Sequence, residues 1–279
     1  MSVKKEITKK ITYDKAFIID MDGVINKGKV LIPGAMDFVG RLKDGGFRFL
    51  FLTNNSYFTP EELKERMNKI GIKVEKERFY TSAMAMASFL LYQVHKKSRF
   101  SAYVIGGNGL LKELKAAGVK ITKNRPDYVI VGETEEYDYL TIREASLLIQ
   151  EGARFIATNP DITGPTKRGP VPACGALVAP IQKTTGIAPY FVGKPNPIMM
   201  YLARKKLGVH SANCFMIGDR MDTDIIGGLE SGMTTCLVLS GVTSKERAAR
   251  FPYQPDYIFN NVGEIDPATI LSRRDRVST

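Results

Sequence analysis

The chain has 279 residues, 44% of them hydrophobic and 25% charged, a composition that suits one large or two ordinary globular domains. No apolar run is long enough to cross a bilayer, and the basic N-terminus MSVKKEITKKITYDK lacks the apolar region of a signal peptide, so we predict a cytoplasmic protein with no membrane partner. The net charge of +11 is compatible with nucleic-acid binding, a lysine-rich surface or attraction of small anions, but the basic residues form no long block, so we predict no nucleic-acid partner.

Short β-rich runs alternate with helical runs along the whole chain. Strand candidates, in order, are residues 17–20, 47–55, 77–82, 101–107, 127–133, 154–160, 190–193, 214–219, 234–241 and 256–261. Helix candidates are residues 35–46, a helix opened by Thr59-Pro60-Glu61-Glu62, and residues 83–95, 109–118, 141–153, 176–186, 197–208 and 224–232. This alternation predicts an α/β fold with parallel sheets covered by helices on both faces. We expect the polar ends, MSVKKEITK and SRRDRVST, to be frayed.

Some conspicuous residues have ordinary explanations. The glycine-rich stretch 106–109, GGNG, lacks the Lys-Ser/Thr of a phosphate loop, so we interpret it as a turn into a helix. Three scattered cysteines indicate reduced thiols and no disulfide framework. A nucleophilic Cys174 would need a nearby base that the sequence does not reveal.

Polar side chains collect where four predicted strands end, and in an open parallel sheet ligands bind at that edge. They are Asp20 and Asp22 after FII, Thr53, Asn54, Asn55 and Ser56 after FLFL, Lys194 after FVG, and Asp219 and Asp224 after CFMIG. Clustered carboxylates without histidine favour a hard cation such as Mg²⁺, and a shared cation would remove the repulsion between neighbouring acids. A lysine and a threonine hydroxyl suit phosphate oxygens. The set therefore predicts metal-assisted phosphoryl transfer.

These motifs resemble a known superfamily. DMDGV at 20–24, FLTNNS at 51–56, VGKPNP at 192–197 and GDRMDTD at 218–224 are similar, in order and spacing, to the four motifs of the haloacid dehalogenase superfamily. TNPD at 158–161 and GPVPACGAL at 169–177 resemble the cap segment of its NagD-like, p-nitrophenyl phosphatase-type subgroup. The resemblance covers nearly the whole chain. It implies a Rossmann-like, doubly wound parallel core, formed by residues 1–97 and 189–279, with a smaller α/β cap domain inserted at residues 98–188.

The resemblance also implies a role for each core residue. Asp20 would be the nucleophile that becomes an aspartyl phosphate, and Asp22 would act as general acid and then general base. Thr53, Asn54 and Lys194 would bind the phosphoryl oxygens. Mg²⁺ would be held by the Asp20 carboxylate, the Asp22 carbonyl and Asp219, with Asp224 supporting the metal shell. Valine at position 24 replaces the threonine that is common in the superfamily, a change that is usual in this subgroup. In the cap, we expect Asn159 and Asp161 to determine substrate specificity.

The leading hypothesis is therefore a Mg²⁺-dependent phosphatase, a phosphoric monoester hydrolase acting through an aspartyl phosphate. Its substrates would be small phosphate monoesters such as nucleoside monophosphates or sugar phosphates, with p-nitrophenyl phosphate as an artificial one. Two alternatives stay open: a phosphotransferase with an acceptor other than water, and a non-catalytic phosphoryl-binding protein on the same fold. A dehalogenase is disfavoured because that chemistry needs neither Asp22 nor a metal. A homodimer is compatible with the sequence.

Overall fold

The computed structural model describes residues 15–93, 100–166 and 168–277, so the polar segment 1–9 predicted to be frayed lies outside the described residues. The chain divides into two compact units. The first comprises the described residues up to Thr53, Lys64–Phe79 and the described residues from Met200 onward; the second comprises those of Asn54–Leu63 and Tyr80–Met199. The predicted cap at 98–188 falls within the second unit, and its boundaries stay a prediction. No helix in the described part of the chain has the length and apolar character that a membrane span requires.

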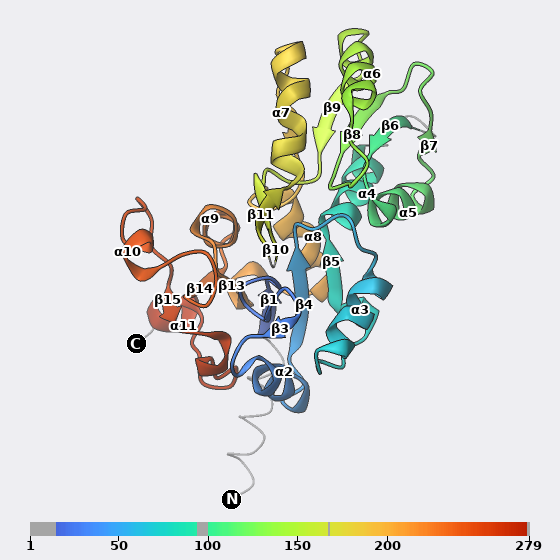
Figure 1. The fold of residues 1–279 in the computed structure, drawn as a ribbon. Helices are drawn as coiled ribbons and strands as arrows, with labels where there is room; N and C mark the ends of the chain where they lie inside the picture. Colours follow the sequence, from blue (N-terminus) through green and yellow to red (C-terminus); the bar gives the residue numbers. More distant parts are fainter. Residues whose placement is uncertain (1–14, 94–99, 167, 278–279) are drawn as a thin grey trace, which may run out of the picture. The chain divides into compact units, whose positions relative to one another are not determined.

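A six-stranded sheet forms the core of the first unit (Figure 1). Its order is β15 (Tyr257–Phe259), β14 (Thr234–Val238), β13 (Cys214–Gly218), β1 (Ala16–Ile19), β4 (Arg48–Thr53) and β5 (Phe79–Thr81). The four pairings from β15 to β4 are parallel. Phe17 of β1 stacks on Phe215 of β13 with ring centroids 5.1 Å apart and meets the edges of Phe38 and Phe47. This aromatic packing buries the centre of the sheet and fixes β1 beside β13.

Short elements complete the first unit. They are the antiparallel pair β2 (Asn26–Lys27) and β3 (Val30–Leu31), helices α2 (Ala35–Asp44), α9 (Ile226–Glu230), α10 (Lys245–Ala248) and α11 (Arg273–Val277), the 3₁₀ turns η1 (Lys76–Arg78), η2 (Ser211–Asn213) and η4 (Val262–Glu264), and the π-helical turn η3 (Met221–Ile225). Helices α3 (Pro60–Lys69) and α8 (Pro197–Leu207) and strand β5 have residues in both units. The predicted start of α3 is confirmed, because the Thr59 hydroxyl accepts from the Glu62 N–H while the Glu62 carboxylate accepts from the Thr59 N–H.

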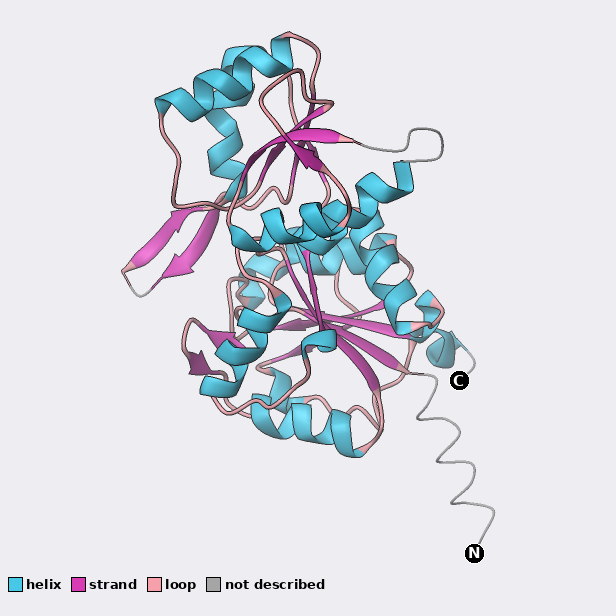
Figure 2. Cartoon of the chain, turned by 90° about the vertical axis from the view of Figure 1, so that its right-hand side faces the viewer, coloured by secondary structure: helices cyan, strands magenta, loops and turns pink. Residues whose placement is uncertain are grey.

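The second unit has its own five-stranded sheet, all of whose pairings are parallel. Its order is β12 (Tyr190–Phe191), β9 (Arg154–Ala157), β8 (Tyr128–Val131), β6 (Ser101–Ile105) and β7 (Lys120–Ile121), with helices α4 (Ser82–Gln93), α5 (Asn108–Ala116), α6 (Tyr139–Gln150) and α7 (Cys174–Thr185). Buried side chains of α6 and α7 pack together against β8 and β9. Strands β10 (Thr163–Thr166) and β11 (Gly169–Pro172) form a separate antiparallel pair, the longer pair of magenta arrows at the far left of Figure 2. The predicted parallel α/β architecture is confirmed in both units.

The three thiols of the chain are all buried. Burial raises the pKa of Cys174 and of Cys214 to about 12, and it raises that of Cys236 as well. The Sγ atom of Cys174 lies 3.4 Å from the Val131 carbonyl oxygen, to which it donates. A thiol held in its neutral form is a poor nucleophile, so these cysteines belong to the hydrophobic core.

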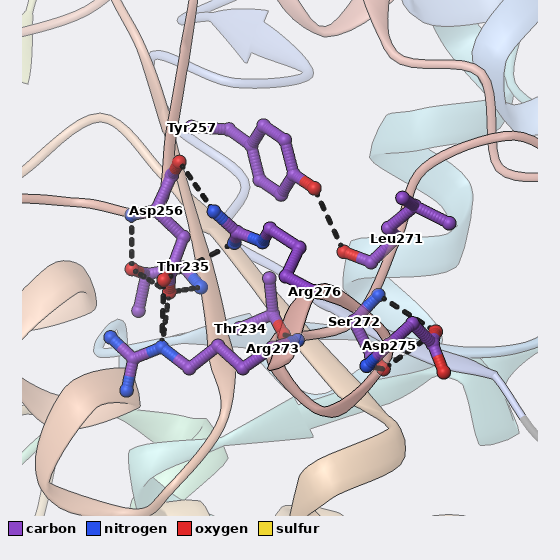
Figure 3. A network of polar contacts seen from close by, with 9 residues as sticks. All are labelled: Thr234, Thr235, Asp256, Tyr257, Leu271, Ser272, Arg273, Asp275 and Arg276. Carbon is purple, nitrogen blue, oxygen red and sulfur yellow. Dashed lines mark hydrogen bonds and ion pairs between the residues drawn. The ribbon is translucent and has the colours of Figure 1, made fainter. Parts of the chain in front are cut away.

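The prediction of a frayed C-terminus is wrong for residues 272–277. Figure 3 shows why: Asp256 holds the helix α11 through Arg273 and Arg276. Its carboxylate accepts from Arg273 Nε at 2.7 Å and pairs with Arg276 at 3.2 Å, and it also accepts from the N–H and hydroxyl of Thr235, each at 2.9 Å. Ser272 and Asp275 add a reciprocal cap at the start of the helix. Charged residues that read as solvated in the sequence therefore form a network on β14 and β15.

This network predicts a pH-dependent contribution to stability. Burial opposes the charge of Asp256, but the hydrogen bonds from Arg273 and Thr235 outweigh it, so the pKa of Asp256 lies below its ordinary value. Its stabilisation is complete above the pKa of an unfolded aspartate, about 3.9, and is lost as pH falls through the lower folded value. Asp256→Asn should lower the free energy of unfolding by about 1–2 kcal/mol at pH 7, with a smaller difference from wild type at pH 3.

Urea unfolding of both proteins at the two pH values measures this difference. Asp44→Asn, which removes an exposed carboxylate at the end of α2, is the matched control and should change stability by no more than about 0.5 kcal/mol. An equal deficit of Asp256→Asn at pH 7 and pH 3 would contradict a role for the Asp256 charge.

Candidate active site

Three aspartates of the first unit form a tight group. One carboxylate oxygen from each of Asp20, Asp219 and Asp224 lies within 4.8 Å of the other two, and all three residues are buried. Asp20 directly follows β1, and Asp219 directly follows β13. Because these strands are parallel neighbours, both residues reach the same edge of the sheet, and the Asp20 N–H donates to the Ile217 carbonyl at 2.8 Å. Asp224 joins them from the turn η3.

The donor set of this group fits a hard divalent cation. Three buried carboxylates this close repel one another and become stable together when a cation or bound protons compensate their charge. The group contains aspartates alone, and oxygen-only ligation of this kind suits Mg²⁺ better than a softer metal. The prediction that Asp20 and Asp219 share a cation is thus consistent with the geometry.

The loop after β14 holds Asp219 in place, and sequence reasoning missed it. The Val242 N–H donates to Asp219 Oδ2 at 2.7 Å, and the Thr243 N–H donates to the Asp219 carbonyl at 3.2 Å. A Cβ atom on Gly241 would lie 1.9 Å from Asp219 Oδ2, and one on Gly23 would lie 2.4 Å from it. Both positions therefore require glycine. The signal was present, because SGVT at 240–243 lies at the carboxyl end of the predicted strand 234–241, where ligands bind in an open parallel sheet.

Gly241→Ala is expected to impair the aspartate group directly. The added methyl group overlaps the Asp219 carboxylate, so either the loop or the carboxylate must move. We expect kcat/KM for a phosphate monoester to fall on the order of 100-fold, since small displacements of positioned groups have effects of this size. The control is Gly40→Ala on α2, where an added Cβ has no neighbour within 4 Å and where alanine favours the helix. Wild-type kinetics in Gly241→Ala would show that the loop gives way freely.

Asp22 has a partner that orients it. Its side chain is exposed, and Asn26 Nδ2 donates to its Oδ1 at 3.1 Å and to the Gly28 carbonyl at 3.0 Å. Asn26 is buried at the start of β2, so it fixes the direction of the Asp22 carboxylate. Asn26 was not among the predicted site residues. Thr53 is buried at the end of β4, the other strand neighbour of β1.

The second unit brings four further predicted residues together. Asn54 Nδ2 donates to the Lys194 carbonyl at 3.0 Å, and the Lys194 N–H donates to Asn54 Oδ1 at 2.8 Å. The same Nδ2 atom donates to Asp161 Oδ2 at 3.0 Å, and the Asp161 N–H donates to Asn159 Oδ1 at 3.1 Å. Asn54, Asn159 and Lys194 are buried, whereas Asp161 is partly exposed. The Asn54 side chain thus holds the backbone of Lys194, a residue 140 positions away in the sequence.

Comparison with known proteins gives this arrangement a family. The haloacid dehalogenase-like hydrolase family matches residues 17–120, and the HAD-hydrolase-like family matches residues 191–265. The chain is 44% identical to dihydroxyacetone phosphatase of Corynebacterium glutamicum, over 91% of this chain and 92% of that protein. It is also 44% identical to ribonucleotide monophosphatase NagD of Escherichia coli, over 90% of this chain and 98% of that protein.

Solved structures agree with the sequence comparison. The structure of NagD from Escherichia coli K-12 superimposes with a TM-score of 0.85 at 42% identity, covering 92% of this chain and 99% of that one. The 4-nitrophenylphosphatase of Thermotoga maritima also gives a TM-score of 0.85, at 34% identity, covering 92% of this chain and 97% of that one. The chain belongs to the haloacid dehalogenase-like hydrolases, as predicted. Within them it falls in the NagD-like subgroup, and it is a phosphatase.

Proposed function

We propose that the protein hydrolyses small phosphate monoesters with the help of Mg²⁺, through an aspartyl phosphate on Asp20. The observation that carries this proposal is the buried group of Asp20, Asp219 and Asp224, whose carboxylate oxygens lie within 4.8 Å of one another. Asp20 and Asp219 follow adjacent parallel strands, and Asp224 comes from the turn η3. Asp20, the Asp22 carbonyl and Asp219 would hold Mg²⁺, with Asp224 supporting its shell. Bound there, the cation would supply the positive charge that lets a phosphate dianion approach carboxylates.

Asp20 would act as the nucleophile, and Asp22 would carry out the proton transfers. A carboxylate oxygen of Asp20 attacks phosphorus, so the Asp20–phosphorus bond forms while the ester bond breaks. Asp22 gives its proton to the departing oxygen. It then takes a proton from water, whose oxygen attacks the phosphorus and releases inorganic phosphate and free Asp20. The hydrogen bond from Asn26 keeps Asp22 oriented during both proton transfers.

Thr53, Asn54 and Lys194 would bind the phosphoryl oxygens. Because the Asn54 side chain is bonded to the Lys194 backbone and to Asp161, we propose that Asn54 contributes its main-chain N–H, while Thr53 contributes its hydroxyl. The Lys194 ammonium would neutralise the transferred group.

The relatives and Asp161 support a proposal for the substrate class. The names dihydroxyacetone phosphatase, ribonucleotide monophosphatase and acid sugar phosphatase describe relatives that act on different small phosphate monoesters. We propose that this protein acts on the same broad class. Asp161, partly exposed at the start of the segment that leads into β10, is our candidate for reading the leaving group.

The test is release of inorganic phosphate from p-nitrophenyl phosphate with and without Mg²⁺, followed by kcat/KM for dihydroxyacetone phosphate, nucleoside monophosphates and sugar phosphates. Turnover should require the metal and should differ among the natural esters. Full activity after chelation would contradict the metal assignment. Phosphate appearing on an added alcohol, in place of free phosphate, would favour the phosphotransferase alternative.

A further inference from the structure

Glu133, on the loop after β8, takes part in a chain of hydrogen bonds that the proposed chemistry does not use. Its Oε2 accepts from the Ser56 N–H at 2.9 Å and also from the Ser56 hydroxyl. Its Oε1 accepts from Asn159 Nδ2 at 2.6 Å. Ser56 and Asn159 lie 77 and 26 positions from Glu133 in the sequence, so the contact joins three separate segments of the second unit.

The directions of these hydrogen bonds identify Glu133 as an acceptor. Ser56 Oγ accepts from the Glu133 N–H at 3.2 Å and from the Thr158 hydroxyl at 3.3 Å, which leaves its own hydrogen for the Glu133 carboxylate. Three donors from Ser56 and Asn159 therefore converge on the two carboxylate oxygens. Burial raises the pKa of Glu133, and the hydrogen bonds from Ser56 and Asn159 oppose that rise. The three donors around Glu133 therefore suit a side chain that only accepts hydrogen bonds.

The series of hydrogen bonds continues from Asn159 to the residues that would bind phosphate. Asn159 Nδ2 also donates to the Asn54 carbonyl at 2.7 Å, and the Ser82 hydroxyl donates to the same carbonyl. Asn54 in turn holds the N–H and carbonyl of Lys194 with its side-chain amide. Asn159 is fully buried, which suits it to support Asn54 better than to touch a leaving group, as its specificity role would require.

We propose that Glu133 is a positioning residue for phosphoryl binding: it fixes Ser56 and Asn159, Asn159 fixes the Asn54 main chain, and Asn54 fixes Lys194. The inference rests on the proposed function, because it gives Asn54 and Lys194 their task. It also makes Asn159 a positioning residue, in place of the specificity role expected for it. All of these contacts lie within the second unit.

Glu133→Gln tests the proposal with almost no change of shape. One carboxylate oxygen becomes an NH₂ group, which faces a donor of either Ser56 or Asn159. The hydrogen bond to that residue is therefore lost. The affinity for inorganic phosphate, measured by calorimetry with Mg²⁺ present, should weaken roughly tenfold, the effect of losing one hydrogen bond to a charged group. The Mg²⁺ concentration for half-maximal activity should not change, because the aspartate group lies in the first unit.

Glu135→Gln is the matched control, since it makes the same change at an exposed position of the same loop, and its phosphate affinity should equal that of wild type. In a Lys194→Met background, Glu133→Gln should weaken phosphate binding by clearly less than tenfold, because the two residues act in series. If Glu133→Gln fails to fold, Ser56→Ala removes a single donor to the same carboxylate and should shift phosphate affinity in the same direction.

Two results would overturn the proposal: a folded Glu133→Gln protein with wild-type phosphate affinity, or a lower kcat with unchanged phosphate affinity and KM, which reports only fewer active molecules. A full tenfold loss in the Lys194→Met background would overturn the route through Lys194. A wild type that binds phosphate without hydrolysing esters would refute the proposed function while the binding comparison still decides the role of Glu133. A wild type that does neither would refute both.

Discussion

Asp20→Asn should lower kcat for p-nitrophenyl phosphate on the order of 10⁴-fold or more, because an amide cannot form the phosphoenzyme. Asparagine has nearly the shape of aspartate, and the Asp20 N–H keeps its bond to the Ile217 carbonyl, so the fold should survive. The residue lies at the end of β1, which is paired on both sides and packed through Phe17. The loss should therefore be chemical and not structural.

Two measurements separate these explanations. Steady-state kinetics give the loss in kcat, and beryllium fluoride, which mimics an aspartyl phosphate, should be bound by the wild type and not by the variant. Asp222→Asn is the control, because Asp222 is an exposed aspartate of the same unit that pairs with Arg220 at 3.1 Å. It should retain most of the activity. Appreciable turnover by Asp20→Asn would rule out the nucleophile role.

Asp219→Asn is the second change with a large expected effect. We expect the Mg²⁺ concentration for half-maximal activity to rise by at least about 100-fold. If the new NH₂ group faces Val242, two donors meet where an N–H now donates to Oδ2 at 2.7 Å. If it faces the aspartate group instead, it replaces a cation ligand with a donor. Neither orientation preserves the site, and Asp219 is too deeply buried for water to substitute easily.

The metal requirement can be measured without turnover. Mg²⁺ added to chelator-treated wild type should raise its melting temperature, because a ligand that binds only the folded state stabilises it. The Asp219→Asn variant should show little such rise, and Asp222→Asn should behave like wild type. An unchanged Mg²⁺ requirement in Asp219→Asn would remove this residue from the metal site.

The sequence predicted most of the sheet architecture because hydrophobic runs and turn residues are local signals. The runs at 17–20 and 214–219 correspond to β1 and β13, and the stretch Thr59-Pro60-Glu61-Glu62 corresponds to the start of α3. The acids at the strand ends were predictable for the same reason, since parallel strands bring their carboxyl ends to one edge. Strands β2 and β10 were missed, because β2 has only two residues and the Gly164-Pro165 pair of β10 is typical of a turn.

Contacts between distant segments were beyond the sequence. Nothing in the residues around Glu133 indicates that its carboxylate meets Ser56 and Asn159, and nothing around Asp256 indicates that it meets Arg273 and Arg276. A charged residue in a polar stretch reads as solvated until its partner is known. The same holds for Asn159: the sequence shows its motif, but it does not show that the side chain is buried.

The burial of all three cysteines makes the native chain inert toward thiol-directed reagents. A single cysteine introduced at an exposed position, such as Glu246 on α10, would then be the one reactive thiol under native conditions. A fluorophore or spin label could be attached there without first removing Cys174, Cys214 or Cys236, whose replacement would disturb the hydrophobic core. Unmodified wild type would serve as its own blank, and any labelling of it would report unfolding.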